Sequence, residues 1–193
     1  MERRQVVRLL GSALALPLLP RSADAALDLA DKFHRRLAST EVPFRTLNAD
    51  QQKLVTLISE MVIPETDTPG ATSVKVPEFI DLLLSEWASD DEKKGFLTGL
   101  TDIDAKAAAL SAASTQQARV SKFVELDQAQ RVELLKTLDA ARGDRAGAGL
   151  AFGRLKQLTV YGYFTSQVVQ QKILKTRMYF DSYQGNVPFT PAV

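Results

Sequence analysis

Apolar residues recur at helical spacing along most of the chain, and the clearest example is a pair of segments joined by a short polar loop. In the first segment the apolar positions follow an i, i+3, i+4, i+7 pattern, which is typical of one face of a helix. Pro64 predicts the end of this helix, and Pro77 suits the first turn of the next. The sequence therefore predicts a helical hairpin whose loop is 65–70. Its expected core positions are Leu54, Leu57, Ile58 and Met61 in the first helix, and Phe79, Leu82, Leu83 and Trp87 in the second.

The same period predicts further helices on either side of this hairpin. Asn48 and Asp127 are expected to cap the helices that follow them, with Gln51 completing a capping box. The expected core face near 132–138 consists of Val132, Leu135 and Leu138. The additional helices are expected at 26–37, from Ser89 to about Leu110, from Asp127 to Leu138, from Leu150 to near Gly162, and from a cap at Thr165 and Ser166 to Leu174.

No strand pattern is present, and Gly185, Pro188 and Pro191 argue against regular helix near the end of the chain. The sequence therefore predicts an all-α fold: a single-domain, irregular helical bundle of about seven helices. An extended C-terminal tail is expected from Tyr179 onward.

The N-terminus resembles an export signal. Arg3 and Arg4 precede an apolar stretch at 9–19, and the small-x-small pattern at 23–25 is typical of a cleavage site. This is the pattern of a twin-arginine signal, and the apolar stretch is shorter than the ~20 residues of a membrane-spanning helix. We therefore expect a signal peptide at 1–25, an N-terminal helix and linker at 26–46, and a helical domain at 47–193.

Sequence motifs near both ends of the helical region carry a family resemblance. The hairpin stretch MVIPETDTPGA at 61–71, followed by VPEFID at 76–81, and the stretch LTVYGYFTS at 158–166 are similar to the opening and closing boxes of the gluconate 2-dehydrogenase subunit 3 family. The segment YQGNVP at 183–188 resembles the short tail of that family. One difference is the run QVVQQ at 167–171, where a glycine-containing run is expected.

The resemblance implies a non-catalytic small (gamma-type) subunit of a periplasmic FAD-dependent sugar or sugar-acid dehydrogenase, either gluconate 2-dehydrogenase-like or glycoside 3-dehydrogenase-like. Such subunits accompany a large flavoprotein subunit of the glucose–methanol–choline family, which binds the FAD, and often a cytochrome c subunit with haem c. The resemblance also implies that the small subunit engages the twin-arginine translocase and stabilises its partner during export. The substrate is left open.

Composition narrows the chemistry that this chain itself can perform. The net charge is +1 without a basic cluster, which argues against nucleic-acid binding. The absence of cysteine excludes disulfides, thiolate ligands and covalent attachment of haem c. His34 is the only histidine, and no phosphate-binding glycine motif is present. We therefore expect no catalytic, cofactor-binding or metal-binding residue on this chain.

Two other functions stay open at this point. A freestanding periplasmic enzyme could use a carboxylate pair such as Glu65 and Asp67 in the hairpin loop, although such residues are more often solvated turn residues. A helical binding or scaffold protein is the second alternative.

Aromatic residues gather in two clusters that could contact a partner. Aromatic side chains supply rigid contact area at protein interfaces, but they also fill cores. The first cluster, at 161–164, is more typical of a core. For the second cluster, at 179–189, a core role and an interface role are equally open. The candidate interface residues are Tyr161, Tyr163, Phe164, Tyr179, Phe180, Tyr183 and Phe189.

Overall fold

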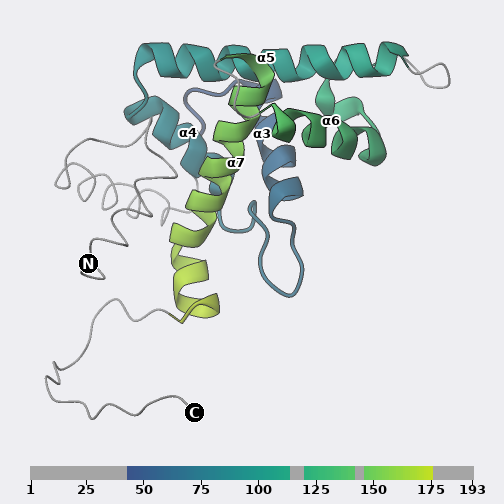
Figure 1. The fold of residues 1–193 in the computed structure, drawn as a ribbon. Helices are drawn as coiled ribbons and strands as arrows, with labels where there is room; N and C mark the ends of the chain where they lie inside the picture. Colours follow the sequence, from purple (N-terminus) through teal and green to yellow (C-terminus); the bar gives the residue numbers. More distant parts are fainter. Residues whose placement is uncertain (1–42, 114–119, 142–145, 176–193) are drawn as a thin grey trace, which may run out of the picture.

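The computed structural model describes residues 43–113, 120–141 and 146–175. Within these ranges the regular secondary structure is entirely helical (Figure 1). The all-α prediction is confirmed. The elements are α3 (Ala49–Val62), α4 (Val76–Glu86), α5 (Asp90–Ala113), the 3-10 turn η1 (Phe123–Glu125), α6 (Gln128–Ala140), α7 (Gly147–Thr165) and the π-helical turn η2 (Val169–Ile173).

The described part of the chain thus has five α-helices, one 3-10 turn and one π turn, against about seven helices expected over the whole sequence. The helix expected at 26–37 and the tail from Tyr179 both lie outside the described residues.

The helical hairpin is confirmed by α3 and α4. The Asn48 side chain accepts a hydrogen bond from the backbone N–H of Gln51 at 2.9 Å, and the Gln51 side chain accepts one from Asn48 N–H at 3.0 Å. This is the predicted capping box. Helix α3 ends at Val62, and Pro77 occupies the first turn of α4, as the proline positions predict.

The buried face of α3 differs from the prediction. Leu54 and Ile58 are buried as expected, but Leu57 and Met61 are only half-buried, whereas Val55 is fully buried. Helix α3 contacts α4, α5, α7 and η1, so it is covered from several directions. The buried face of α3 is therefore wider than the single stripe of apolar positions that the spacing predicts.

The prediction for α6 is wrong at one position. Val132 is 38% exposed, whereas Leu134 and Leu138 are buried and Leu135 is half-buried. Helix α6 packs against α5 and α7, and this packing orients it with Leu134 inward. The Asp127 cap is confirmed, because its side chain accepts a hydrogen bond from Gln130 N–H at 2.8 Å.

Helix α7 is longer than predicted at both ends. Gly162, expected near its C-terminus, lies inside the helix. The ring of Phe79 on α4 lies so close to Gly162 that a Cβ there would be 2.6 Å from the ring. The glycine therefore serves close packing between α4 and α7, and does not end the helix.

Helix α5 lies along one edge of the described structure, where the first turns of α7 cross it (Figure 1). Their contact is close, because a Cβ on Gly99 of α5 would clash with the Cβ of Ala151 on α7. The apolar residues at helical spacing along α5 are buried, namely Phe96, Leu100, Ile103 and Ala107, and Leu110 is half-buried. Helix α7 also contacts α3, α4 and α6, so it is the element around which the core forms.

A buried carboxylate fixes the entry to α3. Asp81 on α4 is 2% exposed, and it accepts hydrogen bonds from the backbone N–H groups of Arg45 (2.7 Å), Thr46 (3.0 Å) and Leu47 (2.7 Å). Buried carboxylates require such donors, because leaving them unpaired is costly. The segment before α3 is therefore attached to α4 through Asp81.

Candidate partner interface

The end of α7 and the start of η2, residues 157–171, differ from the rest of α7 in their exposure. We call this stretch the distal segment. Residues 147–156 are all buried or half-buried. The distal segment instead exposes several side chains while keeping one face in the core. The exposed residues are Gln157, Phe164, Thr165, Gln167 and Gln171.

The distal segment also contains no charged residue, although Asp, Glu, Lys and Arg make up 24% of the whole chain. The more buried first part of α7 carries Arg154 and Lys156, and Lys156 pairs with Asp139 at 2.8 Å. Surfaces in permanent contact with water are normally rich in charge, whereas the cores of protein interfaces are depleted of it. The distal segment therefore has the composition of an interface.

The structure separates the three predicted aromatic residues of this segment. Tyr163 is 6% exposed and belongs to the core, whereas Phe164 is 47% exposed. Tyr161 is half-buried, and its ring lies 6.0 Å from that of Phe79. Burial raises the pKa of the Tyr161 hydroxyl above its usual range, so it stays protonated and can donate a hydrogen bond. Phe164 and Tyr161 thus present aromatic surface, and Tyr163 does not.

Local contacts hold Phe164 in place. Its ring packs edge-to-face on that of Tyr163, with centroids 5.4 Å apart and an interplanar angle of 88°. The Gln170 side chain donates a hydrogen bond to the Phe164 carbonyl at 2.5 Å. The Ser166 hydroxyl donates to Tyr163 O at 2.8 Å and accepts from Val169 N–H at 3.4 Å, so Ser166 caps, as predicted, the helical residues 167–168 that lead into η2. Thr165 instead donates back to Tyr161 O at 2.7 Å within α7.

The hairpin loop is ordered by Glu60 on α3. Its carboxylate accepts hydrogen bonds from the Thr72 hydroxyl (2.5 Å), Thr72 N–H (3.1 Å) and Glu65 N–H (2.9 Å). Desolvation raises the pKa of Glu60, but these hydrogen bonds outweigh it and lower the pKa below its usual value. A local hydrogen bond from Thr66 N–H to Thr68 O at 3.0 Å also holds the loop.

The carboxylate pair proposed in this loop is exposed. Glu65 accepts a hydrogen bond from the Ser73 hydroxyl at 2.7 Å, and Asp67 lies on the exposed tip of the loop. Within residues 43–113, 120–141 and 146–175, no group of three or more acidic, His or Cys residues could hold a metal ion. The geometry of Glu65 is that of a loop-stabilising residue.

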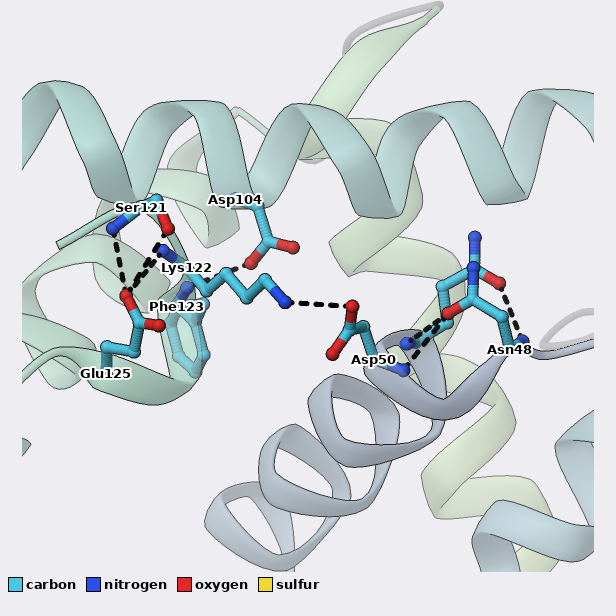
Figure 2. Close-up of polar contacts among 8 residues, drawn as sticks. Asn48, Asp50, Asp104, Ser121, Lys122, Phe123 and Glu125 are labelled. Carbon is cyan, nitrogen blue, oxygen red and sulfur yellow. Dashed lines mark hydrogen bonds and ion pairs between the residues drawn. The ribbon is translucent and has the colours of Figure 1, made fainter.

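A polar network connects η1 to α3 and α5 (Figure 2). Lys122 Nζ lies 2.8 Å from the Asp50 carboxylate, and Asp104 on α5 accepts a hydrogen bond from Phe123 N–H at 2.8 Å. The Glu125 carboxylate accepts from Ser121 N–H and Lys122 N–H at 2.9 and 3.2 Å. The Lys122 and Asp104 contacts join η1 to α3 and α5, and the Glu125 contacts hold the η1 turn itself, so the network has a structural role.

The same contacts shift the pKa values of this network. The Lys122 hydrogen bond lowers the pKa of Asp50, and the Asp50 hydrogen bond raises the pKa of Lys122. The hydrogen bond from Ser121 N–H is the main cause that lowers the pKa of Glu125. All three groups are exposed to solvent, so their contribution to stability is small.

Several predicted residues cannot be placed. The export-signal residues Arg3 and Arg4, the single His34, and the tail residues Tyr179, Phe180, Tyr183 and Phe189 lie outside the described residues. Among the helices that the structure does describe, none is long and apolar enough to cross a bilayer.

Sequence reasoning missed the polar members of the distal segment. Gln157, Gln167 and Gln171 are exposed, but no motif marks them. The sequence shows that residues 157–171 lack charge. This lack of charge points to an interface only once the exposure of these residues is known.

The fold and the site together define an all-α protein whose central helix ends in a partly exposed, partly aromatic stretch without charged residues. The family model "Gluconate 2-dehydrogenase subunit 3" matches residues 49–180, which is more than half of the chain. The chain therefore belongs to this family and is a small subunit of a dehydrogenase complex. Neither the curated proteins nor the solved structures that we searched contain a match.

Proposed function

We propose that this chain is the non-catalytic small subunit of a periplasmic FAD-dependent dehydrogenase that oxidises a sugar or a sugar acid. In this proposal it carries the export signal for the complex and stabilises the flavoprotein subunit. The observation that carries the proposal is the family match over residues 49–180, which includes both the hairpin and the distal segment.

The redox chemistry in this proposal belongs to the other subunits. A large flavoprotein of the glucose–methanol–choline family binds the FAD and oxidises the substrate, and a cytochrome c subunit with haem c accepts the electrons. The small subunit contributes folded contact surface. Binding to the folded form of a partner stabilises that partner by mass action, which is the physical basis of the stabilising role.

The export role rests on Arg3 and Arg4 ahead of the apolar stretch at 9–19. The twin-arginine pathway exports folded proteins, so a flavoprotein could acquire its FAD before crossing the membrane with its small subunit. One export signal, on the small subunit, would then serve the whole complex.

The test is to co-express the tagged full-length chain with its flavoprotein subunit and to measure dehydrogenase activity in periplasm and cytoplasm. Wild type should place the activity in the periplasm, and an Arg3→Lys, Arg4→Lys double variant should leave it in the cytoplasm. An Arg35→Lys, Arg36→Lys variant serves as the matched control and should behave as wild type. Normal periplasmic activity with the Arg3/Arg4 variant would refute the export role, and failure of the wild-type chain to purify with a flavoprotein would refute the complex itself.

A further inference from the structure

The distal segment combines exposure with an absence of charge. Its exposed side chains are an aromatic ring and neutral polar groups, and the stretch contains no Asp, Glu, Lys or Arg. Gln157, Tyr161 and Phe164 follow an i, i+4, i+7 spacing in α7, so they lie on one face of the helix. This face lies toward the end of α7 that points away from α5 (Figure 1).

A second exposed apolar residue provides a contrast on the same molecule. Val132 on α6 is 38% exposed, against 47% for Phe164. Val132 lies in a shallow groove that is also lined by Glu133, Lys136 and Gln128, so charged groups surround it. An isolated apolar side chain among charges is ordinary for a soluble surface. Phe164 has no charged residue within seven positions on either side along the chain.

The contacts of Phe164 also make it a rigid anchor. The Tyr163 ring supports it from the core side, and the Gln170 amide holds its carbonyl. An aromatic side chain that is fixed before binding loses little conformational entropy when a partner covers it. Aromatic anchors of this kind dominate the energy of many interfaces.

We propose that the distal segment is the surface on which the FAD-bearing subunit docks, an inference that rests on the proposed function. The missing charge argues for an apolar recess on that subunit that receives Phe164. Neutral hydrogen-bonding groups of the recess would face Gln157, Gln167 and Gln171. An anionic partner such as nucleic acid or a lipid headgroup would require a cluster of cations, whereas the segment itself has none and is followed by two exposed lysines, Lys172 and Lys175.

The experiment compares Phe164→Asp with Val132→Asp in the full-length tagged chain, co-expressed with the flavoprotein subunit. Captured flavin absorbance is measured per mole of tagged chain. Each variant adds one carboxylate at an exposed apolar position, so the two changes are matched in chemistry. Phe164→Asp should reduce capture by about tenfold or more, as expected for a central anchor, and Val132→Asp should leave capture at the wild-type level.

The outcomes separate the two proposals. Wild-type capture of flavin by the Phe164→Asp variant overturns the docking surface but leaves the subunit role intact. Absence of flavin with the wild-type chain overturns the subunit role, and the docking surface with it. The melting temperature and mass in solution of each isolated variant identify other occupants. A melting temperature lowered by Phe164→Asp well beyond the roughly 2–4 °C that loss of the Tyr163 ring contact accounts for would assign Phe164 to the core of its own chain, and loss of a homodimer would assign it to a second copy. Either result overturns the proposal.

Discussion

The two parts of α7 distribute charge and exposure in opposite ways. The first part, residues 147–156, has no fully exposed residue, yet it contains Arg154 and Lys156. The distal segment exposes several residues and contains no charge. Folding alone would favour the reverse arrangement, because exposed charge costs little and improves solubility. The first part of α7 serves the fold of this chain, and the opposite pattern in the distal segment is the one that the proposed docking surface requires.

The largest expected effect is on folding stability in the first part. Leu155 is fully buried, so Leu155→Ala should lower the free energy of unfolding by about 2–5 kcal/mol. Phe164→Ala should cost about 1 kcal/mol, the order of one aromatic pair. Chemical denaturation of the isolated chain measures both. Equal losses for the two variants would show that the distal segment also belongs to the structural core.

A smaller effect is expected where α5 crosses the first part of α7. A Cβ on Gly99 would clash with Ala151, whereas a Cβ on Gly95 in the same helix would meet nothing. Gly99→Ala should therefore destabilise the chain by about 1–3 kcal/mol, and Gly95→Ala should stabilise it by about 0.5–1 kcal/mol, because alanine favours helix. The two melting temperatures should move in opposite directions, and a shift in the same direction would contradict the packing described here.

Lowering the pH should destabilise the hairpin, because the Glu60 carboxylate holds its loop. It should not act directly on the distal segment. The pKa of Glu60 is lowered in the folded chain, so its stabilisation is present above the unfolded carboxyl pKa of about 4.3 and is lost as pH falls through the folded value. Glu60 is half-buried, so solvent screens part of this effect and the loss is modest. In Glu60→Gln, melting temperature should fall less steeply with acid than in wild type. Parallel curves for the two proteins would show that Glu60 is not coupled to folding.

Much of the fold could be predicted from local sequence. Capping residues such as Asn48 and Asp127, and the prolines around the hairpin loop, act on neighbours within a few positions, so their effect is visible in the sequence. Gly162 was misread as a helix end because its partner is the ring of Phe79, 83 positions earlier in the chain. Asp81 could not be recognised as a buried anchor for the same reason, since its hydrogen-bond donors are 34–36 residues away.

The candidate site was predictable only in part. The closing box LTVYGYFTS carries the family resemblance and contains Phe164, but periodicity could not distinguish the buried Tyr163 from the exposed Phe164 next to it. Which of two adjacent aromatic residues points outward depends on how α7 is rotated against its neighbours. That rotation is set by contacts with α3, α4 and α5.

The smallest expected effect is that of salt on docking. An uncharged interface should bind with nearly the same affinity when the Debye length shortens from about 10 Å in 0.1 M salt to about 3 Å in 1 M salt. Capture of the flavoprotein subunit at both salt concentrations tests this expectation. A strong loss of capture at high salt would favour docking through a charged region, such as the hairpin loop with Glu65 and Asp67.

The most direct test places a photo-crosslinking phenylalanine analogue at position 164, and at position 132 as the control. Both side chains are exposed in this chain, at 47% and 38%, so both probes can reach a partner if one is present. We expect illumination of the co-expressed complex to link position 164, and not position 132, to the FAD-bearing subunit. Crosslinking from position 132 alone, or from neither position while the complex stays intact, would contradict it.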